Sequence, residues 1–172
     1  RLIGLVQYAR AQQDIRYYLN GLLLVVIGNE VRVVATDGHR LAYASEQIEE
    51  AQSRTEVILP RKTILELSRL LSDNDDVLDI RLSPNQAQFR FGDIELVSKL
   101  IDGKFPDYER VIPQSHNKVI TLPRTMLLQS LHRAAILTNE KFRGVRLVLA
   151  PGSMKIISNN ADQEEAQEEI EI

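Results

Sequence analysis

The sequence predicts an α+β fold built from antiparallel sheets and a small number of helices. Short runs rich in Val, Ile, Leu and Phe are separated by Gly, Asn, Asp and Pro, which is the pattern of antiparallel strands joined by turns. Other segments place apolar residues at helical spacing, and two of them follow the triplet Leu-Pro-Arg. The chain also echoes itself at the offset that carries Arg1 onto Arg124, so a repeated unit is expected.

The first part of the chain is expected to begin inside a helix that ends near Gln12, because apolar residues recur there at helical spacing. Residues 22–27 and 31–35 then predict two strands of a hairpin that turns about Gly28 and Asn29. A strand that would precede the first helix is not in the sequence. We therefore expect a unit that lacks its first strand.

Further strands are expected at 41–45 and 57–59, before a helix that begins at Pro60 and runs through Leu71. Proline is favoured at the first position of a helix, because its missing N–H would have no partner there. The same Leu-Pro-Arg start recurs before the helix predicted at 124–137. Two helices with similar beginnings are therefore expected.

Strands are expected next at 77–82, 87–91 and 94–100. The irregular, proline-containing stretch 102–117 is the best linker candidate in the chain. We therefore predict two domains, 1–117 and 118–172, of which the second is truncated. The second domain is expected to open with a strand at 119–122 and to end with a strand at 167–172.

Composition limits the classes of protein to which the chain can belong. With 44% hydrophobic and 26% charged residues, the chain has the composition of a globular protein, and its lack of Cys excludes disulfides and thiolate chemistry. The longest apolar stretch, 22–27, is far shorter than the roughly 20 residues of a membrane helix. The N-terminus shows no signal pattern, so a cytoplasmic protein is expected.

The net charge of −3 argues against a bulk basic nucleic-acid binder. Basic residues nevertheless outnumber acidic ones in the predicted helices, whereas acidic residues gather at 73–79 and in the tail at 162–171. Lys62 and Arg69, seven residues apart, share one helical face. This pattern indicates either a local surface for an anionic partner or a merely solvated helix face.

The run from Val33 to Ala42 is the most informative part of the chain. An apolar strand stops at the polar residues Thr36, Asp37 and Gly38, and a second strand begins directly after them. Two nitrogen-rich side chains, His39 and Arg40, follow in the turn. Taken alone, the run also fits an ordinary hairpin with a solvated basic tip.

Three motifs then identify a family. The motifs are A-T-D-G-H-R-L at 35–41, S-K-L-I-D-G-K-F-P-D-Y at 98–108 and N-E-K-F-R-G-V-R-L at 139–147. In this order and with this spacing, they resemble the bacterial sliding clamp, the beta subunit of the replicative DNA polymerase. The resemblance covers essentially all of the chain.

The resemblance implies a DNA-clamp fold, with antiparallel sheets outside and two helices per domain inside. It also implies a processivity factor whose ring encircles duplex DNA and tethers the replicative polymerase, the clamp loader and repair proteins through short linear motifs. The chain would be a fragment: the middle domain of the clamp and the first half of the third. The resemblance implies a homodimeric ring for the full-length protein, which we do not expect for this fragment because the first domain is missing.

The family implies DNA contacts at five positions. These positions are Gln13, Tyr17, Tyr18, Arg61 and Lys62. We add Arg10 and Arg133 from their charge and from their equivalence in the internal repeat. Without the resemblance, the two adjacent tyrosines equally fit one ring packed in the core and one ring in water.

The family also implies a hydrophobic groove that accepts a short peptide with a Gln and one or two Leu or Phe anchors. The matching positions are Leu19, Thr36, Gly38, His39, Arg40, Leu41, Pro106, Arg110 and Val111. The apolar members would form walls for the anchors, Gly38 would let the partner approach closely, and the basic members would donate hydrogen bonds. The remaining groove residues lie beyond Ile172, so a weakened groove is expected.

A third site implied by the family is the ring-closing interface. Its positions are Ile136, Leu137, Glu164, Glu165 and Glu168. Gln167 stands where some members carry another acid, so the number of ion pairs there stays open. From sequence alone, the two apolar positions equally fit a buried helix end.

An enzymatic function is not expected. Asp37 with His39 could suggest a base or a metal ligand pair, but His116 lies in the linker and His132 has no second ligand at helical spacing. No glycine-rich phosphate loop or nucleophile elbow is present in the sequence. We expect no cofactor, no metal and no membrane partner. The alternative is a non-enzymatic protein-interaction module without DNA contact.

Overall fold

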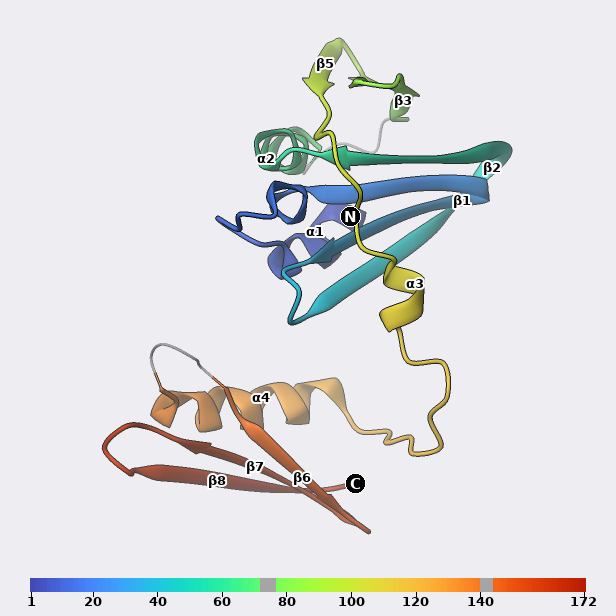
Figure 1. Cartoon of the computed structure of the whole chain (residues 1–172). Coiled ribbons are helices and arrows are strands. Elements are labelled where there is room, and N and C mark those ends of the chain that lie inside the picture. Colours follow the sequence, from blue (N-terminus) through green and yellow to red (C-terminus); the bar gives the residue numbers. More distant parts are fainter. Residues whose placement is uncertain (72–76, 140–143) are drawn as a thin grey trace. The chain divides into compact units, whose positions relative to one another are not determined.

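The computed structural model describes residues 1–71, 77–139 and 144–172, which form two compact units, Arg1–Ile112 and Pro113–Ile172 (Figure 1). Part of the acidic run at 73–79 and residues 140–143 of the third motif lie outside the described residues. The division into domains at 117 stays a prediction. Each unit is described by itself.

Unit 1 (Arg1–Ile112) begins with helix α1 (Leu2–Val6), which continues as a 3-10 turn over Gln7–Ala9. The helical segment therefore ends before the predicted Gln12, because Arg10 already has an extended backbone. A second 3-10 turn, Tyr17–Asn20, leads into the first strand.

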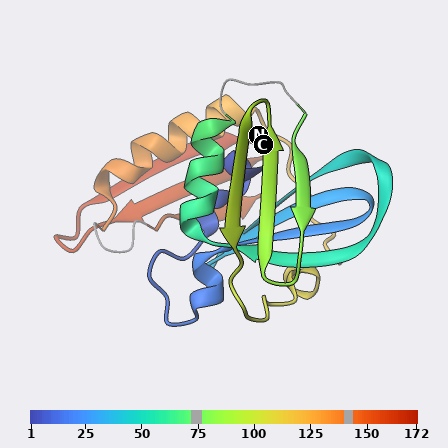
Figure 2. The same ribbon diagram turned by 90° about the horizontal axis from the view of Figure 1, so that it is seen from above.

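Strands β1 (Leu22–Thr36) and β2 (Leu41–Leu59) form one antiparallel ribbon closed by the turn at 37–40. The expected hairpin about Gly28 and Asn29 is wrong: the register shifts on both sides of Gly28, but the strand continues. Gly28 has a φ of 54°, so the backbone bends there without ending the pairing with β2. The bend of β1 lies inside the bend of β2 (Figure 2).

The strands expected separately at 41–45 and 57–59 are parts of β2. Helix α2 (Arg61–Leu70) follows, and Pro60 precedes its first residue with an extended backbone instead of starting the helix. The buried residues of α2 are Thr63, Ile64 and Leu67. Their spacing of three and four residues defines the face that packs inward.

A second sheet contains β3 (Asp79–Leu82), β4 (Gln86–Phe91) and β5 (Ile94–Lys99) in that order. Ile101 then pairs with Ile58 of β2, which connects the end of β5 to the ribbon. The stretch predicted as irregular contains one short helix, α3 (Tyr108–Val111).

The two faces of the β1–β2 ribbon pack into two separate clusters. Alternate residues such as Leu22 and Leu24 face α1, α2 and the buried side chains of β4. The intervening residues Leu23 and Val25 face a second cluster. That second cluster consists of Ala11, Leu19, Leu23, Val25, Val34, Ile58, Phe105 and Tyr108, and is called here the outer cluster.

Unit 2 (Pro113–Ile172) begins without the expected strand at 119–122, whose residues form no ladder with the described part of the chain. Val119 is 77% exposed, so the apolar residues that suggested a strand find no partner to bury them. Helix α4 (Arg124–Ala134) follows Pro123 and ends in a 3-10 turn, Ala135–Leu137. The predicted helix at 124–137 is thus formed as an α-helix and a final tighter turn.

Three antiparallel strands, β6 (Arg146–Ala150), β7 (Ser153–Asn159) and β8 (Glu165–Glu171), complete unit 2. Helix α4 contacts β7 and β8. Buried Ser158 of β7 donates a hydrogen bond to the carbonyl oxygen of Ala134, near the end of α4. The final strand, β8, starts at Glu165, before the predicted residue 167.

The internal repeat relates the bend in unit 1 to a turn in unit 2. The offset that carries Arg1 onto Arg124 also carries Gly28 and Asn29 onto Pro151 and Gly152. In unit 2 this dipeptide separates β6 from β7, and Gly152 has a φ of 79°. The turn expected in unit 1 is therefore formed in its repeat equivalent.

Candidate functional site

The turn at 36–41 is held by its own side chains. Thr36 is 7% exposed; its hydroxyl donates to the carbonyl oxygen of Arg40 at 2.7 Å and accepts from the Gly38 N–H at 3.0 Å. Asp37 accepts from the N–H groups of His39 and Arg40 at 2.9 and 3.0 Å. Burial raises the pKa of Asp37. The two backbone hydrogen bonds lower it, and with the nearby charge of Arg40 they outweigh burial, so the pKa of Asp37 lies below its ordinary value.

The loop around Asp14 braces this turn. The Arg16 guanidinium donates two hydrogen bonds to Asp14, at 2.9 and 2.7 Å, and these bonds lower the pKa of Asp14 to about 2. The same guanidinium donates to the carbonyl oxygen of Asp37 at 3.4 Å. A Cβ atom added to Gly38 would lie 3.2 Å from the nitrogens of Arg16. Within the chain, the close neighbour of Gly38 is therefore Arg16, and the close approach of a bound partner stays a prediction.

The apolar residues predicted for the groove divide into two sets. Leu19 is 1% exposed inside the outer cluster, and Leu41 packs against that cluster. Pro106 and Val111 are exposed, Val111 by 63%. Leu19 is thus a core residue, whereas Pro106 and Val111 are surface residues.

Phe105 and Tyr108 connect these two sets, and sequence reasoning missed both as site residues. They are 8% and 3% exposed and belong to the outer cluster together with Leu19. They are the two aromatic residues of the second motif, 98–108. Their size and apolar rings were the available signal.

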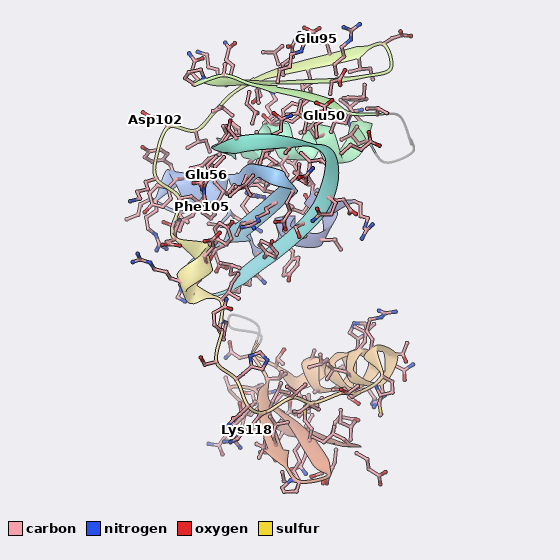
Figure 3. All side chains as sticks on the ribbon, turned by 90° about the vertical axis from the view of Figure 1, so that its right-hand side faces the viewer. Glu50, Glu56, Glu95, Asp102, Phe105 and Lys118 are labelled. Atoms are coloured by element: carbon pink, nitrogen blue, oxygen red, sulfur yellow. The ribbon has the colours of Figure 1, made fainter. Side chains whose placement is uncertain are left out.

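A hollow of about 940 Å³ lies beside this segment in unit 1. Pro106 and Arg110 line part of it, together with Glu56, Asp102 and Phe105. Figure 3 shows Asp102 and Phe105 on the segment that runs from β5 past the ribbon to α3. Two predicted groove residues therefore border a hollow that sequence reasoning did not predict.

The exposed face of α2 carries Arg61 and Lys62, opposite the face that packs on the sheets. Across the described residues, neither cation has an ion pair. Arg69 lies on the same exposed surface and pairs with Glu66 at 2.8 Å. The structure thus leaves positive charge on the outward face of this helix.

Arg10 is placed differently from the other predicted DNA contacts. Its guanidinium donates to the carbonyl oxygens of Ala11 and Asn20, at 2.9 and 3.3 Å, and is partly buried. This burial, followed by the nearby charge of Arg61, lowers the pKa of Arg10. Arg10 therefore supports the backbone and adds its charge beside Arg61.

Gln13 lies in the loop before the second 3-10 turn, and Tyr17 and Tyr18 are the first two residues of that turn. Gln13 is exposed, Tyr17 is 56% exposed, and the two tyrosine rings meet edge to face at 5.9 Å. Tyr18 is partly buried against the outer cluster. One ring is packed and the other is in water, as the residues alone also allowed.

In unit 2, residues predicted for two different sites contact each other. Arg133, predicted for DNA, forms a two-point ion pair with Glu168, predicted for the ring interface. Glu164 accepts a hydrogen bond from Asn160 at 2.6 Å, and Glu165 is exposed. Ile136 is 77% exposed, so the alternative of a buried helix end is wrong for this residue, whereas Leu137 is partly buried.

The three histidines share one environment. His39, His116 and His132 are all exposed. Over the described ranges 1–71, 77–139 and 144–172, no three His, Cys, Asp or Glu residues are grouped so that they could hold a metal ion. Nor is any described helix long and apolar enough to cross a membrane.

Comparison with known proteins adds independent observations. A sequence model of the DNA polymerase III beta subunit, central domain, matches residues 1–107, and that of its C-terminal domain matches residues 109–172. The chain is 51% identical over its whole length to the beta sliding clamp of Pseudomonas putida and 46% identical to that of Escherichia coli. It covers 47% of each relative.

Solved structures agree in fold. The DNA polymerase III subunit beta of Pseudomonas aeruginosa matches 99% of the chain at a TM-score of 0.94 and 50% identity, over 47% of its own length. Another structure of that clamp, bound to griselimycin, matches at a TM-score of 0.92. The predicted α+β clamp fold is confirmed, although the chain spans about half the length of these relatives. The chain belongs to the DNA polymerase III beta subunit family.

Proposed function

We propose that this chain is part of a processivity factor, which encircles duplex DNA as a segment of a ring and holds replication and repair proteins through a peptide-binding groove. Membership of the clamp family supports this function. A ring threaded by DNA stays on it by topology, so its inner surface needs only weak contacts with phosphates. The exposed cations of α2 suit such weak, sequence-independent contact.

One observation supports the groove most directly. The turn at 36–41 and the segment 105–111 are far apart in sequence, yet both rest on the outer cluster, through Leu41 and through Phe105 and Tyr108. The predicted groove positions are therefore carried by two segments with one common support. Exposed Val111 and Pro106 offer apolar surface, and exposed His39 and Arg110 offer donors.

A peptide titration tests the groove. A fluorescent peptide with a Gln and Leu and Phe anchors is added to the chain, and anisotropy is recorded. We expect saturable binding, weaker than to the Pseudomonas putida clamp, because the family draws further groove residues from the end of its third domain. Val111→Glu should abolish the signal, and griselimycin, which binds the Pseudomonas aeruginosa clamp, should compete. Binding that does not saturate would contradict the groove.

DNA contact has its own test. Anisotropy of a short fluorescent duplex is measured with the chain at several salt concentrations. We expect weak binding whose salt dependence falls when Lys62 is replaced by Gln, with a loss of about one unit of slope per phosphate contact removed. An unchanged slope in Lys62→Gln would favour the alternative, a protein-interaction module without DNA contact.

We further propose that the function is not catalytic and that a homodimeric ring forms only in the longer protein. The partners would be duplex DNA, the replicative polymerase, the clamp loader and repair proteins. A cytoplasmic location fits these partners.

A further inference from the structure

Helix α3 carries two of the predicted groove residues but cannot hold its own shape. It has four residues, Tyr108–Val111, and a single turn is far below the length at which helices are stable in water. Arg110 and Val111 point to solvent, with 85% of the Arg110 side chain exposed. The placement of these side chains therefore depends on the packing of Phe105 and Ile112 on either side of the helix and on the contacts made by Tyr108 and Glu109.

Tyr108 provides the apolar anchor. Its ring is 3% exposed in the outer cluster and stacks on the ring of Tyr43, with centroids 6.0 Å apart and planes at 26°. Its hydroxyl donates to Glu109 at 3.3 Å and accepts from Arg32 at 3.3 Å. The polar end of the buried ring is thus held by Glu109 of α3 and by Arg32 of β1.

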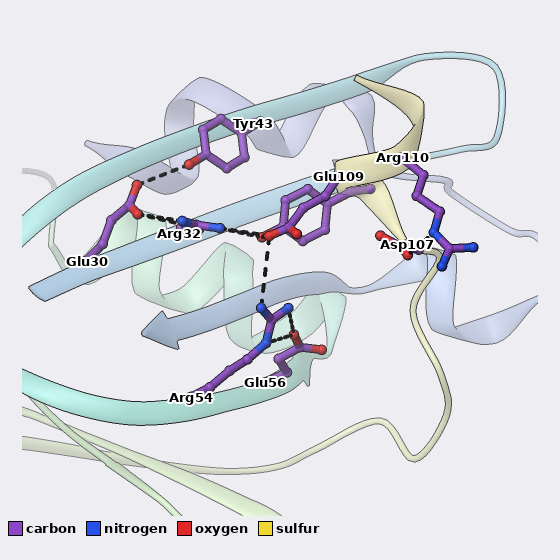
Figure 4. A network of polar contacts seen from close by, with 9 residues as sticks. Glu30, Arg32, Tyr43, Arg54, Glu56, Asp107, Glu109 and Arg110 are labelled. Carbon is purple, nitrogen blue, oxygen red and sulfur yellow. Dashed lines mark hydrogen bonds and ion pairs between the residues drawn. The ribbon is translucent and has the colours of Figure 1, made fainter. Parts of the chain in front are cut away.

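Arg32 is the centre of a polar network on this face of the ribbon (Figure 4). Its Nη1 atom lies 2.9 Å from Glu109, and its Nε and Nη2 atoms each lie 2.8 Å from one oxygen of Glu30. Glu30 accepts a further hydrogen bond from Tyr43 at 3.1 Å. The planar guanidinium of Arg32 therefore joins the Tyr108 hydroxyl and the Glu109 carboxylate to Glu30 of β1. Through Glu30 the network also reaches Tyr43 of β2.

Other arginines cannot replace it. Arg54 pairs with Glu56, and its Nη1 atom reaches Glu109 only at 4.0 Å. Arg110 pairs with Asp107, one residue before α3, and so stays within the same segment. Arg32 has a side chain only 22% exposed, and its hydrogen bonds to Tyr108 and Glu30 raise its pKa, so it keeps its charge.

We infer that Arg32 is a positioning residue for the peptide groove: by holding Tyr108 and Glu109, it fixes the turn of α3 that presents Arg110 and Val111. The inference rests on the proposed function. No peptide needs to touch Arg32, because its effect passes through the helix that it anchors.

The first arm of the test measures α3 itself. The amide of Ile112 donates to the carbonyl oxygen of Tyr108, so its hydrogen exchange reports the closing of this turn. Arg32→Gln should speed exchange of Ile112 about tenfold relative to the core amide of Val25, as expected for lost charge-assisted hydrogen bonds. Arg32→Lys keeps the charge but lacks the planar, bidentate guanidinium, so it should retain part of the protection.

The second arm measures the groove by titration of the labelled peptide. Arg32→Gln should raise Kd about five- to tenfold, and Arg81→Gln, an exposed arginine of β3, should leave it unchanged. Tyr108→Phe keeps the ring and loses the hydroxyl, so it should show a smaller change in the same direction. This variant also serves if Arg32→Gln fails to fold.

The outcomes separate cleanly. Faster exchange of Ile112 with a raised Kd supports the inference. Unchanged exchange overturns it, and so does faster exchange with an unchanged Kd, because α3 would then not govern the groove. If the unaltered chain binds no peptide, the proposed function fails for this chain, whereas the exchange arm still decides whether Arg32 holds α3.

Discussion

Arg133 and Glu168 form a two-point ion pair in which Nε lies 2.9 Å from Oε1 and Nη2 lies 2.7 Å from Oε2. The pair joins α4 to β8. Arg133 also donates to the hydroxyl of Ser130 at 3.0 Å. Two charges that were predicted to meet different partners thus offset each other within unit 2.

This pairing leads to a prediction about DNA. Arg133→Gln should reduce duplex binding less than Lys62→Gln does, because the charge of Arg133 is already offset by Glu168, whereas Lys62 has no ion-pair partner across the described ranges. Both variants change the net charge equally, which makes them a matched pair. The measurement is the slope of log K against log salt for a fluorescent duplex. An equal or larger loss in Arg133→Gln would show that the pair opens when DNA binds.

The same pair gives unit 2 a pH dependence. The hydrogen bond from Arg133 lowers the pKa of Glu168, so the pair stabilises the folded state above the unfolded pKa of about 4.3. That stability is lost as the pH falls through the lowered folded pKa. Urea midpoints of the chain and of Glu168→Gln should therefore differ at neutral pH and converge below the folded pKa. A difference that persists at the lowest pH would mean that the carboxylate is not its source.

Gly38 offers a test of the brace between the loop at 14–16 and the turn. Its φ is 91°, and an added Cβ would lie 3.2 Å from Arg16, so Gly38→Ala should cost at least about 1 kcal/mol of unfolding free energy. Gly28→Ala meets nothing within 4 Å and has a φ of 54°, so its cost should be smaller. Urea denaturation compares the two variants. Equal costs would show that the contact with Arg16 contributes nothing.

Gly4→Ala should change the unfolding free energy in the opposite direction. Gly4 lies in α1, and an added Cβ would meet nothing within 4 Å. Alanine should therefore stabilise the chain by up to about 1 kcal/mol, the difference in helix propensity between the two residues. Thermal unfolding followed by circular dichroism would record a higher midpoint. A lower midpoint would indicate a backbone that only glycine allows.

Ile136 tests the predicted ring interface. Because it is 77% exposed, Ile136→Asp should change the stability of this chain by less than about 0.5 kcal/mol. In the longer clamp, the same change should weaken self-association, which sedimentation velocity would detect. Leu128→Asp, on an exposed position of α4, is the matched control that should leave association intact. Equal weakening by both changes would point to charge alone.

The sequence was a good guide where local chemistry decides the structure. The polar turn at 37–40 formed where expected, and α2 begins one residue after the predicted Pro60, since turn residues and proline act through their own backbones. The strand predicted at 119–122 is not formed, because its apolar residues have no ladder partner among the described residues. The continuous strand through Gly28 also escaped prediction, because its partner lies far along the chain in β2.

The candidate site divides in the same way. The motifs located the turn and the segment before α3, but they could not show that Arg16 closes against Gly38 or that Leu19 is buried. Arg32 looked like an ordinary strand residue with no motif of its own. Its role depends on Tyr108 and Glu109, which only folding brings to it.

The hydrogen bond from Ser158 to the carbonyl oxygen of Ala134 has a consequence for assembly. If the helix end frayed there, the buried hydroxyl and the carbonyl oxygen would both lose their hydrogen-bond partner. The turn that bears Ile136 and Leu137 is therefore held against β7. A molecule that docks there meets a surface whose shape is already set. Association then avoids most of the entropy loss that ordering a loose helix tip would bring.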